Sequence, residues 1–140
     1  MNFRQISAAV VVMALCALAL VSSPSPQGAL QGKDIAINDD DKTMTLECKG
    51  GAVIVNGDDN TLTMKDDCSG LTLNGDDNTI NARTITAIAV FGDDNKIAVE
   101  TVSRITTTGD DNTITWKNVA GGKSPQISKL GDNNTIKQAN

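Results

Sequence analysis

The chain has 140 residues, with 17 acidic and 12 basic side chains, no histidine and no tyrosine. Its net charge of −5 argues against binding of nucleic acid, because phosphate backbones are bound by basic surfaces. The absence of histidine removes the commonest general base and the commonest ligand of transition metals, so composition favours a protein that is not an enzyme.

Residues 1–27 have the pattern of a signal peptide with a short linker. Arg4 is followed by an apolar run over residues 8–21 and then by the polar break SSPSPQG. A charged start, an apolar middle and small residues near a cut are typical of an export signal. The run is shorter than the roughly 20 residues of a membrane-spanning helix. We therefore expect a protein exported to the periplasm, the cell envelope or the extracellular space, without a stable membrane span after processing.

Residues 28–140 have the length of one domain and repeat a single phrase. NGDDNT occurs at residues 56–61 and 74–79, with variants at 91–96, 108–113 and 130–135, and a weaker copy, NDDDKT, at 38–43. The glycine of each phrase is its anchor, and Asp39 takes that place in the weak copy. Successive anchors are separated by 18, 18, 17, 17 and 22 residues. Repetition at a nearly fixed period indicates a solenoid of stacked units.

Apolar residues recur at fixed positions around each anchor, four and two residues before it and five and seven after it. In the unit of Gly75 these residues are Leu71, Leu73, Ile80 and Ala82. The two members of each pair are two residues apart, so both point to the same side of a strand. Each unit therefore predicts a short strand, a corner at the GDDN phrase, a second short strand and a less regular second corner.

One unit of 17–18 residues cannot bury its apolar side alone, whereas stacked units can. The predicted fold class is all-β, a single-stack parallel β-solenoid (β-helix) of about six such coils, preceded by the signal peptide. The five extra residues of the last spacing fall within AGGKSPQ, which we interpret as an outward loop at the second corner. Lys129 and Gln138 place polar groups in apolar columns of the last coil, which is typical of a protected sheet edge. The open edges also make self-association through the solenoid ends an expectation.

Two cysteines, Cys48 and Cys68, follow the predicted signal. Both stand at the second corner, where later units carry Ile85, Val102 and Val119. Adjacent coils would bring them together, and an even number of cysteines in an exported chain favours a disulfide. Such a bond would contribute about 3 kcal/mol. Two unpaired, buried thiols are the alternative.

The repeat resembles the exported bacterial proteins grouped as domain of unknown function 3060. That family repeats G-x-x-N-x-[VI] and has two cysteines near its start. Here Gly57-Asp58-Asp59-Asn60-Thr61-Leu62, its later copies, and Cys48 with Cys68 match that pattern over roughly residues 34–137. The resemblance implies an exported β-solenoid and implies no activity.

The glycines and asparagines of the phrase suit a structural turn. Glycine adopts positive φ without strain, and asparagine is the next most tolerant residue there. Stacked asparagine amides can also form a hydrogen-bonded ladder between coils. We therefore assign a structural role to Gly57, Gly75, Gly92, Gly109 and Gly131, and to Asn60, Asn78, Asn95, Asn112 and Asn134.

The paired aspartates of the phrase raise the question of a metal. Stacking in register places like charges about 5 Å apart, so something should offset their repulsion. Ca²⁺ prefers oxygen ligands and accepts flexible coordination. One hypothesis is Ca²⁺ between the carboxylates of adjacent coils; the alternative is that solvent, salt and turn N–H groups suffice. The candidate ligands are Asp58, Asp59, Asp76, Asp77, Asp93, Asp94, Asp110 and Asp111.

The sequence favours an exported, non-enzymatic structural or binding protein that presents a repetitive solenoid face to an unknown envelope or surface partner. The alternative is a calcium-stabilised adhesion or ligand-binding module. Threonines flank the inward residue five positions after the anchor in T-x-T pairs, as on ice-binding solenoids, but Lys96, Ala98, Asn81 and Lys137 interrupt that array. An enzyme using carboxylates is the remaining alternative, against which stand the position of the acids at corners and the lack of long loops. Apart from the calcium hypothesis, no cofactor is expected.

Overall fold

The structure is a computed structural model that describes residues 32–122 and 124–140. The predicted signal peptide and linker, residues 1–27, lie outside the described residues. Within them the chain forms nine strands and no helix, so no described helix could cross a membrane. The strands are β1 (Ile35–Ile37), β2 (Thr43–Leu46), β3 (Ala52–Asn56), β4 (Thr61–Asn74), β5 (Thr79–Phe91), β6 (Lys96–Thr108), β7 (Thr113–Val119), β8 (Gln126–Leu130) and β9 (Thr135–Gln138).

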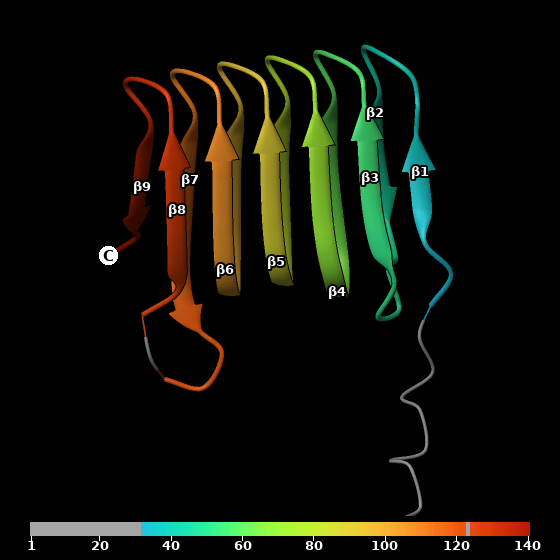
Figure 1. Cartoon of the computed structure of the whole chain (residues 1–140). Helices are drawn as coiled ribbons and strands as arrows, with labels where there is room; N and C mark the ends of the chain where they lie inside the picture. The colour runs from blue at the N-terminus through green and yellow to red at the C-terminus, as the bar shows by residue number, and fades with distance from the viewer. Residues whose placement is uncertain (1–31, 123) are drawn as a thin grey trace, which may run out of the picture.

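Every strand pairs in parallel with its equivalent in a neighbouring coil (Figure 1). One column, for example, runs from Ile35 to Val53, Leu71 and Ile88, as the repeat spacing predicted. The chain is therefore a parallel β-solenoid of about six coils, which confirms the predicted fold class.

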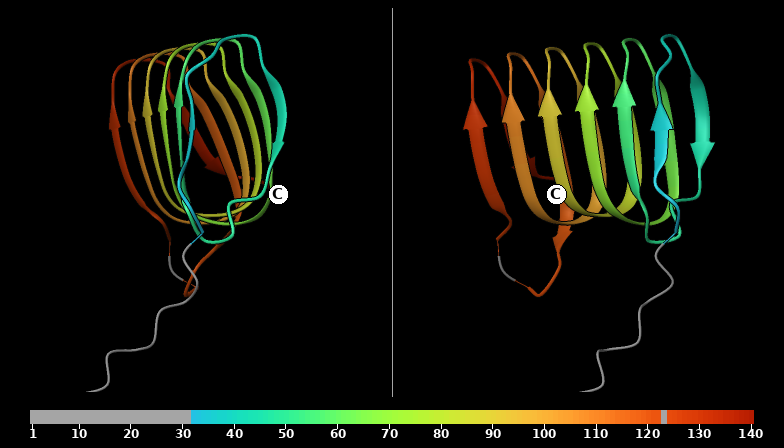
Figure 2. Two further views of the ribbon diagram at one scale, coloured as in Figure 1. Left: turned by 90° about the vertical axis from the view of Figure 1, so that its right-hand side faces the viewer. Right: turned by 45° about the vertical axis from the view of Figure 1, so that its right-hand side comes forward.

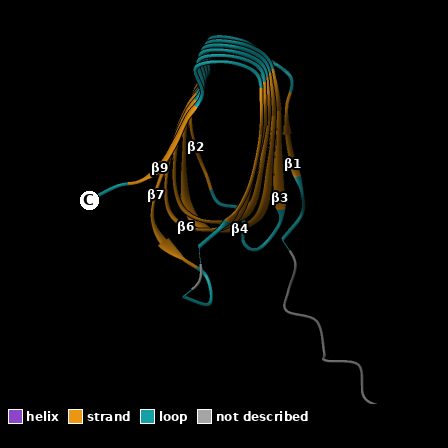
Figure 3. Ribbon diagram, turned by 60° about the vertical axis from the view of Figure 1, so that its left-hand side comes forward, coloured by secondary structure: helices purple, strands orange, loops and turns teal. Residues whose placement is uncertain are grey.

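The core is a single stack of apolar residues inside the coils. Seen nearly along the stack, each coil is a flattened loop with the GDDN corners piled at one end and a rounded bend at the other (Figures 2 and 3). The inward columns from the two sides meet between them and are buried, for example Leu71, Leu73, Ile80 and Ile85. Because each coil buries its apolar residues against the coils on both sides, the middle of the stack is the best covered part.

The second corner differs from the prediction of two short strands separated by an irregular turn. β4, β5 and β6 have 14, 13 and 13 residues and run through this bend without a break. Neighbouring coils bend in register there, with Cys68 paired to Ile85 and Ile85 paired to Val102. The ladder therefore continues around the corner, apart from one irregularity between Met64 and Asp67. Two short strands were the wrong prediction for these coils.

The two ends of the stack are less well covered. Met44 in the first coil and Ile127 in the last stand in inward columns, yet they are 40% and 46% exposed because no further coil among the described residues covers them. Between β7 and β8 the chain leaves the stack, and pairing resumes with Arg104 opposite Gln126. The predicted outward loop is therefore confirmed in the part of the chain that is described.

Candidate functional site

The glycine of each GDDN corner allows close approach of successive coils. Gly75 has φ 145°, and a Cβ there would collide with the carbonyl oxygen of Gly57 in the preceding coil. The other residue with positive φ is the second aspartate of each phrase, for example Asp59 with φ 58° and Asp77 with φ 56°. The asparagines of the phrase are not among the positive-φ residues, so Asn60 and its equivalents do not use the tolerance of asparagine for this conformation. Only Asn133, which replaces the second aspartate in the last coil, does so, with φ 54°.

The asparagine column lies buried inside the corner and connects each coil to the preceding one. The side chain of Asn95 donates from Nδ2 to the carbonyl of Gly75 at 2.9 Å, and its Oδ1 accepts the backbone N–H of Asn78 at 3.0 Å. The amides also contact one another, because Asn95 Nδ2 donates to Asn112 Oδ1 at 3.1 Å. The same two backbone bonds recur at the other coils, so these side chains are structural groups that water cannot reach. The buried residues are Asn60, Asn78, Asn95, Asn112 and Asn134.

The first aspartate of each phrase has a defined structural partner. Asp76 Oδ1 accepts the backbone N–H of Asp93 in the next coil at 2.8 Å, and Asp93 Oδ1 accepts that of Asp110 at 2.7 Å. The carboxylates thus receive a donor from the following coil, and this offsets part of the repulsion along the column. The bonds repeat for Asp40, Asp58, Asp76, Asp93 and Asp110.

The second aspartate of each phrase has no such donor among the described residues. Desolvation raises the pKa of the Asp59 carboxyl, and the neighbouring charges of Asp41 and Asp77 raise that pKa further. Asp59, Asp77, Asp94 and Asp111 are exposed, with their backbones held by the corner. This column is therefore the part of the corner whose charge is least compensated.

The eight candidate calcium ligands line up as two columns and do not form a compact cluster. Among the described residues, one group of three potential metal-ligand side chains lies close together, namely Cys48, Asp66 and Cys68. Cys48 and Cys68 are joined as a disulfide, so their sulfurs are not free thiolates. The disulfide predicted from the repeat is thus present.

Asp66 and Asp67 have structural roles that sequence analysis did not find. Asp66 accepts the backbone N–H groups of Cys48 and Lys49 at 2.6 and 2.9 Å, and so holds the first bend beside the disulfide. Hydrogen bonds from Thr84 and Arg83 hold the pKa of the Asp67 carboxyl below its usual value. One sequence signal could have found them: Cys68 lies eleven residues after its anchor Gly57, whereas Ile85 lies ten after Gly75, and the ladder is irregular between Met64 and Asp67.

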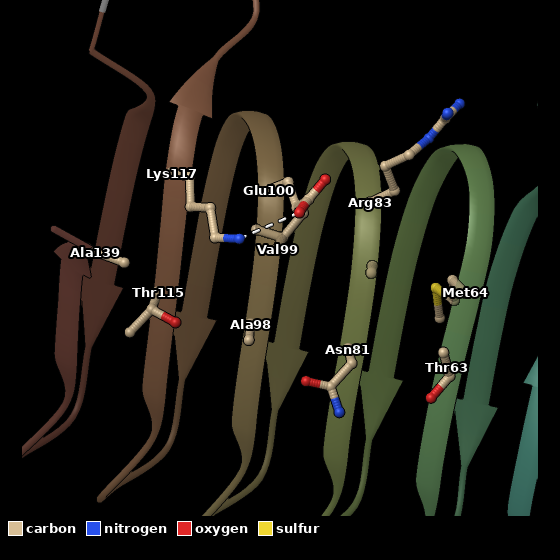
Figure 4. A pocket seen from close by; sticks show the side chains of 11 residues that line it. Thr63, Met64, Asn81, Arg83, Ala98, Val99, Glu100, Thr115, Lys117 and Ala139 are labelled. Atoms are coloured by element: carbon tan, nitrogen blue, oxygen red, sulfur yellow. Dashed lines mark hydrogen bonds and ion pairs between the residues drawn. The ribbon is translucent and has the colours of Figure 1, made fainter.

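A shallow groove crosses the strands on the side of the solenoid that contains β4 to β7. Two rows of outward side chains border it (Figure 4). One row is Thr63, Asn81, Ala98 and Thr115, which are register partners in successive coils. The other row includes Arg83, Glu100 and Lys117, in which Lys117 Nζ lies 3.2 Å from Glu100 Oε1.

Ala98 leaves room in the groove, because its methyl group is the smallest side chain in its row. The hollow has a volume of about 390 Å³ and a largely apolar floor between polar edges. The same residue interrupts the threonine array, so this face is not a flat rank of threonines. The groove follows the stacking direction, and an occupant would contact several coils at once.

Two stretches of the chain, residues 55–98 and 84–133, match the model of a family described as Protein of unknown function (DUF3060). Together they cover more than half of the chain and lie inside the segment that the repeat pattern singled out. No curated protein and no solved structure matched the chain.

Proposed function

Since the chain belongs to the DUF3060 family, whose description assigns no activity, we propose that it is an exported, non-enzymatic structural or binding protein of the cell envelope or extracellular space. It presents one repetitive face of its β-solenoid to a partner. The groove over Ala98 carries this proposal, because it combines an apolar floor with hydroxyl, amide and charged edges.

The shape of the groove favours an elongated partner. Successive coils lie about 4.8 Å apart, and the groove is lined by residues from Thr63 to Ala139 along the stack. A polymer chain or an extended loop lying along the axis would contact the same row in each coil. Thr63, Asn81 and Thr115 offer hydrogen-bonding groups along one edge, and the Glu100–Lys117 pair lies along the other.

The disulfide supports export. Disulfides persist in oxidising compartments and are uncommon in the cytosol, and Cys48–Cys68 joins the first two full bends of the stack. This agrees with the signal pattern in residues 1–27.

The binding proposal is tested by filling the groove. In Ala98→Arg a long side chain occupies the hollow, and Ala89→Arg makes the same change on the opposite side, where Ala89 pairs with Thr72 and Thr106. Wild type and Ala89→Arg are expected to be retained on isolated cell-envelope fractions, whereas Ala98→Arg is expected to lose most of that retention. Equal retention of both variants would show that the groove is not the binding surface, and no retention of wild type would refute an envelope partner.

A calcium-stabilised adhesion module is a second candidate, favoured by the second aspartate column. Its carboxylates have no donor among the described residues, and the pKa of Asp59 is raised by desolvation and, in addition, by the neighbouring carboxylates. A bridging cation would remove that repulsion. Calorimetric titration with Ca²⁺, together with melting temperatures before and after chelation, tests it; no heat and no change in melting temperature would exclude this candidate.

A further inference from the structure

The bonds between coils are directional, so the two ends of the solenoid carry different groups. In each corner the anchor glycine donates its N–H to the following coil, as Gly109 does to Leu130. The second aspartate does the same, as Asp111 does to the carbonyl of Asp132. In the opposite direction, Thr135 donates its N–H to the carbonyl of Asn112 in the preceding coil. An end of the stack therefore exposes the half of this pattern that its missing neighbour would complete.

The last coil exposes four groups of this kind at its corner. By the repeat, the N–H groups of Gly131 and Asn133 face away from the stack. So does Oδ1 of Asp132, because the equivalent oxygen of Asp110 accepts the N–H of Asp132 itself. The carbonyl of Asn134 is the fourth, since the equivalent carbonyl of Asn112 accepts Thr135.

The first coil offers the complementary four groups. The carbonyls of Asn38 and Asp40 are equivalent to those of Leu130 and Asp132, which accept hydrogen bonds from the preceding coil. The N–H groups of Asp40 and Thr43 are equivalent to those of Asp132 and Thr135, which donate to the preceding coil. The apolar columns continue as well. Ile127, 46% exposed, would meet Ile35 of a second copy, and the half-buried Ile136 would meet Met44, which is 40% exposed.

Lys129 interferes with this continuation. It occupies the inward column that carries Val90 and Thr107 in preceding coils, and its Nζ donates to the carbonyl of Asn134 at 3.3 Å. That carbonyl is the acceptor that Thr43 of a second copy would need. The same side chain places a charged amine at the end face beside the exposed Ile127, where a docked copy would cover it, and an unpaired amine is costly to bury.

We propose that the two ends of the solenoid are complementary surfaces for a second copy of this chain, docked head to tail, and that Lys129 keeps the chain monomeric by covering the C-terminal end. The docked copy continues the parallel ladder and the apolar columns. Since an open edge of parallel strands is a template for pairing with another chain, one side chain at that edge decides between a monomer and a growing stack.

Sedimentation velocity over a range of protein concentrations tests this proposal with Lys129→Val. This substitution introduces valine, the residue that stands in the same column at Val90. Lys137→Val is the matched control, because it removes the same charge from the same coil at an outward position. Wild type and Lys137→Val are expected to sediment as monomers, and Lys129→Val as oligomers whose mass rises several-fold with concentration. Circular dichroism establishes that each variant keeps its β structure.

A third variant identifies the second surface. Thr43→Pro in the Lys129→Val background removes the N–H donor of the opposite end, since proline has none, and is expected to restore the monomer. Monomeric Lys129→Val would overturn the proposal, and so would wild type that associates equally, or equal association of Lys137→Val. Association that persists in the double variant would also overturn it, because docking would not then be head to tail.

Discussion

A single buried amide in each coil holds its own corner to the corner of the preceding coil. Asn95 satisfies the carbonyl of Gly75 and the N–H of Asn78, two backbone groups that lie inside the corner without access to water. Buried backbone groups without partners are costly, so the amide is needed for its shape and for its two kinds of hydrogen-bonding atom.

Asn95→Leu should therefore destabilise the protein strongly, although it keeps the branching and the number of heavy atoms of the side chain. It leaves two buried backbone groups unsatisfied at about 1–3 kcal/mol each, so about 2–6 kcal/mol in total. Asn81→Leu makes the same change on the exposed side of the same coil, where the cost is expected to stay within about 0.5 kcal/mol. Urea denaturation monitored by circular dichroism compares them, and equal losses would contradict the role of the ladder.

The second aspartate column predicts a stabilising substitution. The raised pKa of Asp59 means that its ionised form is disfavoured in the folded state, so the carboxylate lowers stability above that pKa and the loss disappears as pH falls through it. Asp59→Asn should raise the melting temperature at neutral pH, with a difference from wild type that shrinks in acid and in high salt. Asparagine fits this backbone, because Asn133 occupies the equivalent place.

Asp67→Asn is the control of opposite sign. The lowered pKa of Asp67 means that its carboxylate stabilises the fold above its unfolded pKa, and that this contribution is lost as pH falls through the folded value. The substitution should lower the melting temperature at neutral pH. If both variants move it in the same direction, the assigned electrostatics are wrong.

Sequence alone predicted which residues face inward and that asparagine amides link the coils, but not how the aspartates connect them. The columns of Leu71 and Ile80 follow from spacing, because side-chain direction alternates along a strand. The hydrogen bonds of Asp76 and Asp93 do not follow from spacing. Both aspartates of a phrase have the same chemistry, and only the backbone conformation of the corner decides which one accepts a bond from the next coil. The first aspartate of each phrase therefore has a structural role, and the second aspartate is the remaining candidate for a functional role at the corner.

At the level of the element, the two corners are built differently. The GDDN corner turns sharply and needs glycine, whereas the second bend is gradual enough to remain a strand. The repeat phrase marked the first corner plainly. The second corner contains no glycine or proline in the unit of Ile85. The lack of these turn residues is consistent with a strand that continues through the bend.

Gly75→Ala separates crowding from backbone strain. The φ of 145° is a region that only glycine adopts readily, and the added methyl would meet the Gly57 carbonyl. A cost of more than about 2 kcal/mol is expected, because such strain alone costs of order 1–3 kcal/mol. Gly121, at φ 82° with nothing near an added Cβ, provides the control: Gly121→Ala should cost only the strain, about 1–2 kcal/mol. Thermal melts of the two variants give the comparison.

For the whole molecule, each coil contacts only the coils beside it, so stability is a sum along one dimension. The Cys48–Cys68 disulfide therefore acts locally, on the coils of β1 to β4.

Replacing both cysteines with alanine should cost about 3 kcal/mol, concentrated at that end. Hydrogen exchange is expected to quicken in β1, β2 and β3 while β6 and β7 keep their protection, relative to wild type. A uniform rise in exchange across all strands would show instead that the stack unfolds as one cooperative unit.

Because the hydrogen bonds between successive coils are nearly identical, the solenoid can accept an additional coil. Residues 79–95 form one full period, and both of its surfaces fit a copy of itself, because Thr79 and Lys96 hold the same place in successive coils. A tandem duplication of that segment would insert into the ladder without disturbing the disulfide end or the Lys129 end, and would extend the rod by about 4.8 Å. Duplication or deletion of whole periods therefore changes the length of the solenoid in steps of one coil.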